Sequence, residues 1–252
     1  MRRFFLEKQP AASRPAVLEG VQARHAASVL RLAIGARVEL FNGSGRAWEA
    51  EITDISPGRV DLAVLSERPA PPPPAVRVHL AMALVKPKKM DLAVRMATEL
   101  GAAGFHPFEA ARSVPRPKDP DARGERWQKI AWEAAKQSRN NQAMTVFPLA
   151  SLAEAEARTR GFALRVLFWE NQPAPFSLPM GPESAPGLSG DVLAMVGPEG
   201  GFTPVEAKTL LDSGFLPAAL GPRILRAETA AAMACGLLQY TLGDLGERGE
   251  EG

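Results

Sequence analysis

Residues 192–206 read VLAMVGPEGGFTPVE, and this stretch is the clearest guide to the fold of the 252-residue chain. The apolar run 192–196 has the length and composition of a buried strand. Thr203 suits a helix N-cap, Pro204 the first helical position and Glu206 the third, which together predict a capping box. The order is therefore strand, glycine loop and helix N-terminus. In an open sheet such a loop lies at the carboxyl end of a strand, where ligands bind.

The glycine loop itself, GPEGG at 197–201, does not match the common nucleotide-binding patterns. It has neither the Gly-Lys-Ser/Thr of a phosphate-binding loop nor the Gly-x-Gly-x-x-Gly of a dinucleotide-binding loop. Its glycines allow backbone N–H groups to approach a ligand closely. A ligand-binding loop and a plain turn are both open on these residues alone.

Strands and helices alternate on both sides of this stretch, which predicts an α/β domain with a mainly parallel sheet. The short apolar runs predict strands, and apolar residues three and four apart predict helices. The expected strands are 76–84, 162–169, 192–196 and 218–220, and the expected helices are 89–100, 124–138, 204–213 and 229–240.

The residues before this region have a different pattern, and a proline run, RPAPPPPA at 68–75, separates the two parts. Consecutive prolines favour a stiff extended spacer. Before it, two alternating runs flank the turn NGSG, which predicts a hairpin. A third strand is expected at 60–65 and a short helix at 24–32. We therefore expect a small β-barrel over residues 1–70 and the α/β domain over residues 76–246.

Composition narrows the function classes. Hydrophobic residues make up 46% of the chain and charged residues 23%, as in ordinary globular proteins. No apolar run approaches the roughly 20 residues that span a bilayer, and the apolar stretch 4–6 is too short for a signal peptide. We therefore expect a cytoplasmic protein with no membrane partner. The single cysteine, Cys235, excludes an internal disulfide, and the three histidines lack ligand spacing, so no metal is expected.

The net charge is +2, but the cations are unevenly distributed. Residues 1–37 hold seven Lys and Arg against two Glu. A region this basic suits contact with RNA phosphates, and a solvated basic surface is the alternative. The candidates for RNA contact within it are Arg2, Arg3, Arg24 and Arg31.

Three polar motifs follow the proline run. Lys86, Lys88 and Lys89 stand at an expected helix N-terminus, where they oppose the helix dipole; a phosphate partner would offset this placement, and flexible solvated lysines are the alternative. The segment KQSRNNQ at 136–142, with Lys136 and Arg139, is either an RNA contact or a polar helix end.

The third motif is LGPRILRAETA at 220–230. Arg223 and Arg226 lie three apart beside the turn and suit either ion pairs or phosphate contacts. Glu228 opens an alanine-rich helix, where an acidic side chain suits the dipole.

Five blocks of this sequence, in order, resemble the RsmE family of the SPOUT methyltransferase superfamily. The resemblance covers nearly the whole chain. The blocks are HAASVLRLAIGARVELFNGSGRAWEAEI at 25–52, KPKKMDLAVRMATELGA at 86–102, ERWQKIAWEAAKQSRN at 125–140, LAMVGPEGGFTPVE at 193–206 and LGPRILRAETAA at 220–231.

This resemblance implies a PUA-like N-terminal barrel for RNA docking and a C-terminal SPOUT α/β domain with a deep trefoil knot. It implies an enzyme that uses S-adenosylmethionine (SAM) to methylate N3 of a uridine in 16S ribosomal RNA, with an active site at a homodimer interface. The residues that it assigns to the SAM pocket are Glu170, Gly197, Glu199, Gly200, Gly201, Leu220, Gly221, Ile224, Leu225 and Arg226.

Two positions depart from the family pattern: Ala227 stands where threonine is usual, and Lys136 where glutamate is usual. Neither lies in the GPEGG loop. For the chemistry, we expect Arg226 to stabilise negative charge that develops on a uracil carbonyl. Glu228 is a weaker candidate for the base, since helix capping explains it equally well.

Two other functions are open on the sequence. The first is a non-catalytic RNA-binding or ribosome-assembly protein that keeps the barrel, which SAM binding would exclude. The second is an enzyme for a small anionic metabolite bound by the GPEGG loop, which would leave the basic N-terminal region without a purpose.

Overall fold

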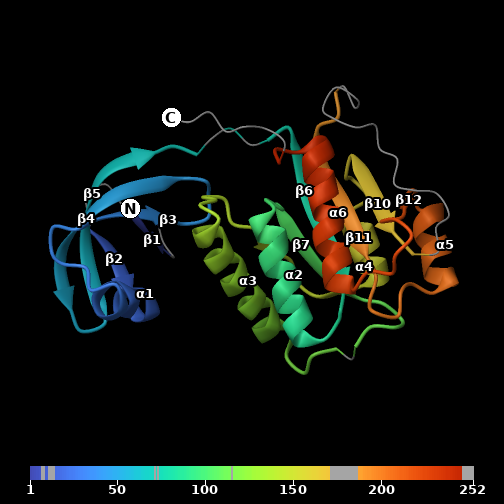
Figure 1. Cartoon of the computed structure of the whole chain (residues 1–252), viewed down its shortest axis with the longest axis horizontal. Helices are drawn as coiled ribbons and strands as arrows, with labels where there is room; N and C mark the ends of the chain where they lie inside the picture. Colours follow the sequence, from blue (N-terminus) through green and yellow to red (C-terminus); the bar gives the residue numbers. More distant parts are fainter. Residues whose placement is uncertain are drawn as a thin grey trace. The chain divides into compact units, whose positions relative to one another are not determined.

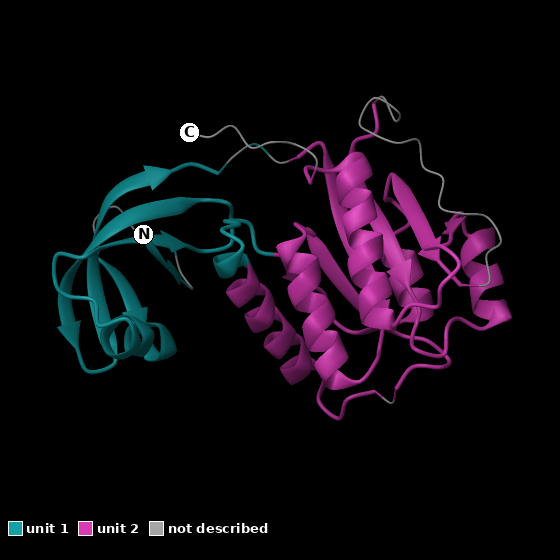
Figure 2. Ribbon diagram, in the orientation of Figure 1, with its two compact units in different colours: residues 1–72, 135–143 teal, residues 73–134, 144–252 magenta. Residues whose placement is uncertain are grey.

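The computed structural model describes residues 1–6, 9–10, 15–70, 72, 74–114, 116–170 and 187–245. Two compact units divide the chain (Figure 2). The N-terminal unit comprises Met1–Pro72 together with Ala135–Ala143, and the C-terminal unit comprises Pro73–Ala134 together with Met144–Gly252. The N-terminal unit therefore includes a segment that the chain reaches only long after the proline run.

The N-terminal unit is built on a five-stranded sheet with the order β1-β3-β4-β5-β2. β1 and β3 are parallel, and the other neighbours are antiparallel. The sheet curls (Figure 1), and its edge strands do not pair in the described part of the chain, so it forms a PUA-like half-barrel. The strands are β1 (Arg2–Phe5), β2 (Ala16–Glu19), β3 (Arg37–Phe41), β4 (Ala47–Ser56) and β5 (Arg59–Arg68).

The predicted hairpin is confirmed by β3 and β4, which pair from Arg37 opposite Glu51 to Phe41 opposite Ala47. Gly43 and Gly45 adopt positive φ angles in the turn between them, as a tight hairpin turn requires. Alternate residues of the strands point inward and form one apolar core, which contains Phe4, Leu18, Val38, Leu40, Trp48, Ile52, Val60 and Leu62.

The helix of this unit differs from the expected 24–32. It begins earlier, as α1 (Gly20–Arg24), and continues as a π-helical turn, η1 (His25–Val29), in which Leu30 N donates to His25 O. The chain then leaves the helix at Arg31, whose φ is +51°. Ala23 of α1 and Ala26 of η1 both lie in the core. The regular α-helical spacing expected over residues 24–32 therefore does not hold in the π turn His25–Val29.

The C-terminal unit has a seven-stranded parallel sheet, so the predicted α/β class is confirmed. Its main path runs β12-β10-β11-β6-β7-β8, and β9 also pairs with β7. The strands are β6 (Val76–Ala83), β7 (Gly104–Glu109), β8 (Thr145–Val146), β9 (Ala150–Ser151), β10 (Leu164–Phe168), β11 (Gly190–Val196) and β12 (Leu216–Ala218). The trefoil knot stays a prediction.

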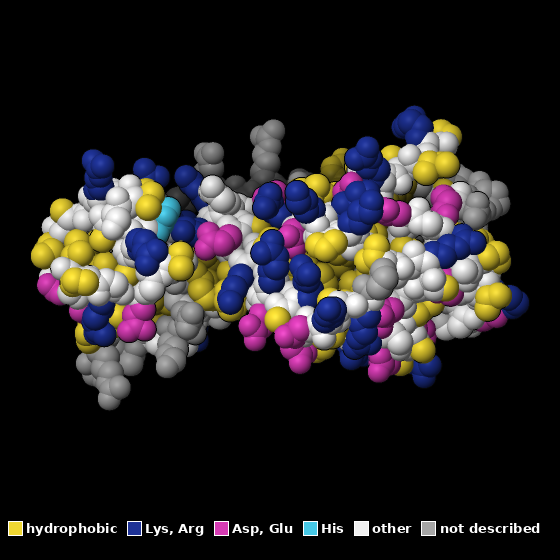
Figure 3. All heavy atoms as spheres, turned by 90° about the horizontal axis from the view of Figure 1, so that it is seen from below, with side chains coloured by type: hydrophobic (Ala, Val, Ile, Leu, Met, Phe, Trp, Pro, Cys, Tyr) yellow, Lys and Arg dark blue, Asp and Glu magenta, His cyan; other side chains and the backbone are white. Residues whose placement is uncertain are grey.

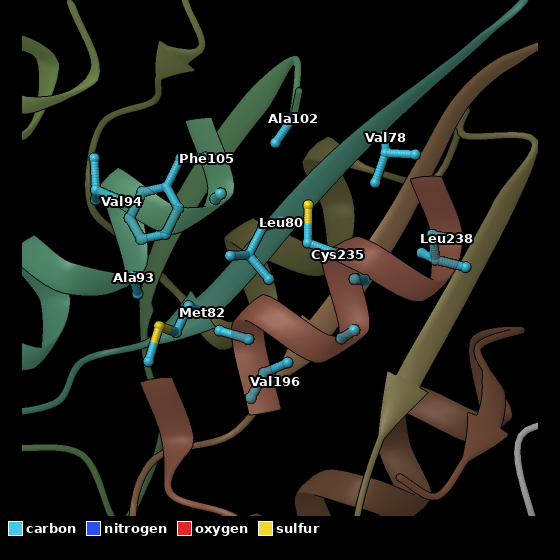
Figure 4. Packing of buried hydrophobic residues seen from close by; sticks show 14 of the residues in the cluster. Val78, Leu80, Met82, Ala93, Val94, Ala102, Phe105, Val196, Cys235 and Leu238 are labelled. Carbon is cyan, nitrogen blue, oxygen red and sulfur yellow. The ribbon is translucent and has the colours of Figure 1, made fainter. Parts of the chain in front are cut away.

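Helices cover both faces of this sheet, so the inner strands β6, β7, β10 and β11 are largely buried on two sides. α2 (Pro87–Glu99), α3 (Pro120–Gln137) and α6 (Ala227–Leu242) pack on the face that carries Val78, Leu80 and Met82 (Figure 4). α4 (Leu152–Arg158) and α5 (Pro204–Asp212) pack on the opposite face, with Ala81, Leu193 and Met195. Two-sided burial explains why the parallel strands read as continuous apolar runs rather than as alternating ones.

Several element boundaries differ from the sequence expectation. β12 ends at Ala218, where a strand was expected to begin, and α6 starts at Ala227 rather than at residue 229. β7, β8, β9 and α4 were not predicted. β7 contains Pro107, a residue type that is unusual inside a central strand. On one side of β7 the neighbouring strand changes at this point, from β8 beside Phe105 to β9 beside Phe108. Residue 107 therefore has no partner strand on that side, and the missing N–H of the proline leaves no inter-strand hydrogen bond unmade there.

Every helix in the described residues is too short or too polar to span a bilayer.

Candidate functional site

The candidate site lies at the carboxyl edge of the parallel sheet in the C-terminal unit. The loops after β6, β7, β10, β11 and β12 all begin at this edge. The N-terminal ends of α2 and α6 also lie there, at the lower side of Figure 1. Figure 3 views the molecule from that side and shows Lys and Arg side chains gathered over it, with acidic side chains between them. The edge therefore combines backbone loops with a mainly cationic surface.

The capping box predicted after the glycine loop is confirmed. Thr203 Oγ1 accepts from Glu206 N at 3.2 Å, and Glu206 Oε2 accepts from Thr203 N at 2.9 Å. Glu206 also has a role that the sequence did not suggest, because its other oxygen accepts from Ala111 N at 2.7 Å. Burial raises the pKa of Glu206, but the hydrogen bonds from Ala111 and Thr203 lower it by more, so the pKa lies below its usual value.

Three glycines of the GPEGG loop lie where a side chain would collide with a neighbour. A Cβ on Gly197 would lie 3.0 Å from the buried ring of Phe202. A Cβ on Gly200 would lie 3.3 Å from the side chain of Arg112, and one on Gly201 would meet the Glu170 carboxylate at 1.9 Å. Gly201 also has φ +65°, which glycine adopts without strain. The loop backbone is thus packed closely enough to form a cradle.

Arg112 fixes this cradle from the loop after β7. Its Nη1 donates to Gly200 O at 2.7 Å. Together with the bond from Ala111 to Glu206, this joins residues 111–112 to both ends of the segment 200–206. The sequence did not indicate Arg112. Its one distinguishing feature is that it follows β7, and the sequence analysis did not predict that strand.

Lys89 joins the glycine loop to α6. Its Nζ lies 2.6 Å from Glu199 Oε1 and 3.6 Å from Glu228 Oε2. Its hydrogen bond to Glu199 raises the pKa of Lys89 and lowers the pKa of Glu199 below its ordinary value. Elements that are more than 100 residues apart in sequence therefore meet at one ammonium group.

Two further cations act on the same cluster. Arg226 and Lys86 both help to lower the pKa of Glu199 electrostatically, after the larger effects of Lys89. The structure thus brings together five predicted residues: Lys86 and Lys89 from the start of α2, Glu199 from the glycine loop, and Arg226 and Glu228 from the start of α6. Three cations against two carboxylates leave this cluster, which we call the edge cluster, with an excess of positive charge.

Glu228 is nearly buried, with 9% of its side chain exposed. It lies in the first turn of α6, whose N-cap Arg226 makes no side-chain capping bond. Its Oε2 is buried and has no hydrogen-bond donor among the described residues; Lys89 is its ion-pair partner. A buried carboxylate oxygen with no donor has a high desolvation cost. Both interpretations of Glu228 therefore stay predictions: an acidic side chain in the first turn of α6 suits the helix dipole, and a buried carboxylate oxygen without a donor among the described residues suits a proton acceptor.

The loop between β12 and α6 is more open than the glycine loop. Gly221 has φ +92°, and Arg223 is exposed. Ile224 is 91% exposed, while Leu220 and Leu225 are half-buried. An apolar side chain as exposed as Ile224 has no packing role within the chain, so it is free to contact a ligand or a partner.

The candidate RNA-binding residues differ in their surroundings. Arg2, Arg24, Arg31, Lys86, Lys88 and Arg139 are exposed. Arg3 is only 9% exposed in its side chain. Its Nε lies 2.6 Å from Glu39, it donates to Asn141 and to the Lys136 carbonyl, and its guanidinium lies over the Phe41 ring. The Lys136 ammonium lies over the ring of Phe4.

Neither the single cysteine nor a metal centre contributes to the candidate site in the described residues. Cys235 is buried, and burial raises the pKa of its thiol to about 12, which makes it inert. The described residues hold no group of three or more His, Cys, Asp and Glu side chains suited to a metal ion.

Comparison with known proteins places this site in a family. A family model described as RNA methyltransferase domain matches residues 72–239, and one described as RNA methyltransferase PUA domain matches residues 18–65. The chain is similar to a Bacillus subtilis protein named ribosomal RNA small subunit methyltransferase E, with 32% identity over 95% of this chain and 96% of the relative. A Mycobacterium bovis protein of the same name is 33% identical over 92% of this chain and 89% of the relative.

A solved structure has the same architecture. It is a ribosomal RNA small subunit methyltransferase E from Neisseria gonorrhoeae bound to S-adenosyl methionine, with 28% identity, a TM-score of 0.85, and coverage of 97% of this chain and 99% of that one. The two family models and the full-length relatives show that this chain belongs to the family of ribosomal RNA small subunit methyltransferases E, the RsmE family.

Proposed function

We propose that this chain is a SAM-dependent methyltransferase that methylates N3 of a uridine in 16S ribosomal RNA. The observation that carries the proposal is the meeting of the glycine loop and the first turn of α6 at Lys89, on the carboxyl edge of the sheet. Relatives across nearly the full length are named as methyltransferases of small-subunit ribosomal RNA, and a structural neighbour holds SAM.

The glycine loop fits a methyl donor. Side chains at three of its glycines would press on Phe202, Arg112 or Glu170, so the loop follows its path against these neighbours only because those residues are glycine. We assign the SAM pocket to Glu170, Gly197, Glu199, Gly200, Gly201, Leu220, Gly221, Ile224, Leu225 and Arg226. When bound, SAM supplies an electrophilic methyl group on a sulfonium.

The chain's own residues must then handle one proton and one developing charge. The N3–CH₃ bond forms as the S–CH₃ bond breaks, and the N3 proton leaves. We assign proton acceptance to Glu228, because its buried Oε2 lacks a donor among the described residues. We assign stabilisation of the negative charge on a uracil carbonyl to Arg226, which belongs to the same edge cluster.

The RNA is proposed to contact both units. We propose that the candidate cations with exposed side chains contact RNA phosphates. These are Arg2, Arg24, Arg31, Lys86, Lys88, Arg139 and Arg223. Arg3, Lys136 and Lys89 have partners inside the protein, so their contribution to RNA affinity is expected to be smaller. We further propose that the enzyme acts in the cytoplasm and as a homodimer, with the small residues of α6 allowing close approach of a second copy.

Mass spectrometry of 16S RNA before and after treatment with the protein and SAM tests this function. The expected product is RNA with one added methyl group, located on N3 of a uridine. Isothermal calorimetry with SAM distinguishes the alternative of a non-catalytic RNA-binding or assembly protein, which predicts no SAM binding. If the protein binds SAM but leaves the RNA unmethylated, the proposed substrate is wrong, whereas the assignment of the SAM-binding fold stands.

Single-turnover methylation tests the catalytic assignments. Arg226→Ala is expected to slow methyl transfer by about 100-fold, while SAM affinity changes far less. Glu228→Gln is expected to slow it by about 100- to 1,000-fold, because the amide cannot accept the proton. Turnover equal to that of the unaltered protein in either variant would remove the role from that residue.

A further inference from the structure

Lys89 occupies an electrostatically unfavourable place in its own helix. It is the third residue of α2, after Lys86 at the N-cap and Pro87 at the first position, and the first turn carries no acidic side chain. Cations at a helix N-terminus are destabilising because they face the positive end of the dipole. The arrangement therefore needs an anionic partner, and the sequence alone suggested RNA phosphate.

The structure supplies that partner from within the chain. Lys89 Nζ is 2.6 Å from Glu199 and 3.6 Å from Glu228, and only 27% of the Lys89 side chain is exposed. The neighbouring Lys88 is exposed. One turn of helix thus presents two lysines with different surroundings, one within the edge cluster and one facing solvent.

The two carboxylates around Lys89 need a cation between them. Glu228 is nearly buried and its Oε2 has Lys89 as its ion-pair partner. Glu199 belongs to the glycine loop, which Arg112 holds at Gly200 on its other side. Lys86 and Arg226 also act electrostatically on Glu199, but Lys89 is the cation that pairs with both carboxylates. Without its ammonium, the glycine loop and α6 would lose this shared ion pair and the repulsion between the two carboxylates would increase.

We propose that Lys89 is a positioning residue that holds Glu199 and Glu228 together, so that the SAM-binding loop and the first turn of α6 form one pre-organised site. It acts through these two carboxylates and not through an RNA phosphate. This inference rests on the proposed function, because it takes the glycine loop as the SAM-binding loop and Glu228 as the proton acceptor.

Paired variants of the full-length protein separate the two roles. Lys89→Met is expected to weaken SAM binding by about tenfold in calorimetry and to lower kcat, with the salt dependence of RNA affinity unchanged. Lys88→Met is expected to do the reverse: RNA affinity falls and the slope of log affinity against log salt shrinks by about one unit, with SAM affinity unchanged. Lys89→Arg is expected to recover most of the SAM affinity, since it restores the positive charge.

A pH series adds a measurement that a purely structural role would not change. Lys89 holds the pKa of Glu199 below its ordinary value, so its removal lets that pKa rise. SAM binding by Lys89→Met is therefore expected to decline at a higher pH than SAM binding by the unaltered protein. In a Glu199→Gln, Glu228→Gln background, the tenfold effect of Lys89→Met is expected to shrink below threefold.

Each outcome decides the inference. If Lys89→Met binds SAM normally but has a reduced RNA salt slope, Lys89 is an RNA contact and the positioning role is rejected, while the proposed function stands. An unshifted pH dependence, or a tenfold effect that persists in the double-glutamine background, rejects it as well. If Lys89→Met does not fold, Lys89→Gln, which is also uncharged but polar, is measured in the same SAM-binding and RNA salt-dependence assays and decides in the same way. Absence of SAM binding in the unaltered protein overturns both the positioning role and the methyltransferase function.

Discussion

Single glycines in the GPEGG loop leave space that neighbouring side chains occupy. Gly197 faces the ring of Phe202, which is 1% exposed and cannot move into solvent. Gly200 and Gly201 instead face Arg112 and Glu170, which are exposed. A side chain at position 197 would therefore meet a neighbour that cannot move away, whereas side chains at positions 200 and 201 would meet neighbours that can.

The constraint at Gly197 predicts a clear loss of stability. Gly197→Ala is expected to lower the free energy of unfolding by about 1–3 kcal/mol, because the methyl group overpacks against a buried ring. Denaturant unfolding measures the change. Gly124→Ala in α3 is the matched control: a Cβ there meets nothing within 4 Å, so stability is expected to stay equal or to rise by about 0.5–1 kcal/mol. Equal losses in both variants would contradict this account.

A buried histidine pair in the C-terminal unit has no evident role at the edge, but it affects stability. His106 Nε2 lies 3.1 Å from His79 Nδ1, His79 Nε2 lies 3.3 Å from Asp191, and the His106 ring stacks on Phe147. Burial lowers the pKa of both histidines, that of His106 to about 3. Both rings are therefore neutral in the folded protein near pH 7.

This pair predicts that stability falls as the pH is lowered. The unfolded chain protonates His106 near pH 6.5 and the folded chain near pH 3, so between these values the unfolded state binds more protons. Each such group reduces the free energy of unfolding by up to about 1.4 kcal/mol per pH unit as the pH decreases. His106→Gln, which does not titrate here, is expected to show a shallower slope between pH 6 and 4 in denaturant titrations. A slope identical to that of the unaltered protein would exclude His106 as its source.

At the scale of elements, two capping boxes of the same kind have different consequences. Ser151 and Glu154 cap α4, and Thr203 and Glu206 cap α5. Only Glu206 also accepts a hydrogen bond from another segment, at Ala111. The box at α5 therefore does two things: it begins a helix, and it holds the loop after β7 against the glycine loop.

This difference predicts unequal costs. Glu206→Ala is expected to reduce the free energy of unfolding more than Glu154→Ala, by about the 1 kcal/mol of one additional hydrogen bond. It is also expected to weaken SAM binding, whereas Glu154→Ala leaves that binding unchanged. Chemical unfolding and calorimetry measure the two effects. The interpretation would be wrong if the two variants lost stability equally and bound SAM equally well.

At the scale of the whole molecule, the proline run does not separate two sequences that are complete in themselves. The N-terminal unit includes residues 135–143. Arg3 donates to Asn141 and to the Lys136 carbonyl, and Ser44 pairs with Gln142 in a β-bridge. The N-terminal unit thus includes the end of α3 and the residues that follow it.

A fragment of residues 1–72 is therefore expected to be less stable than the same unit in the full chain. It keeps the ion pair of Arg3 with Glu39 but leaves this nearly buried guanidinium without Asn141 and the Lys136 carbonyl, and a lost hydrogen bond to a charged group costs about 1.5–3 kcal/mol. Hydrogen exchange of the β3 and β4 amides measures this and should be faster in the fragment. Asn141→Ala in the full chain should accelerate exchange in the same strands to a smaller extent. Equal protection in all three proteins would show that the unit is autonomous.

Local patterns in the sequence determined the elements whose stabilisation is local. The capping box at Thr203, the hairpin at 42–45, the buried strand 192–196 and the α/β class follow from spacing and composition. Signals of this kind are encoded within a few residues, so they survive without tertiary information. They did not predict β7, in which Pro107 lies where the neighbouring strand changes from β8 to β9. They also did not predict the π turn that continues α1.

The sequence analysis singled out all five residues of the edge cluster, but the tertiary structure decided which of them contact one another. Lys89, Glu199 and Glu228 are separated by 110 and 29 positions along the chain, and only the parallel sheet brings the loops after β6, β11 and β12 to one edge. Arg112 gave no local signal. The physical reason is that ion pairing and desolvation depend on the distance between groups in space, whereas the sequence gives only their separation along the chain.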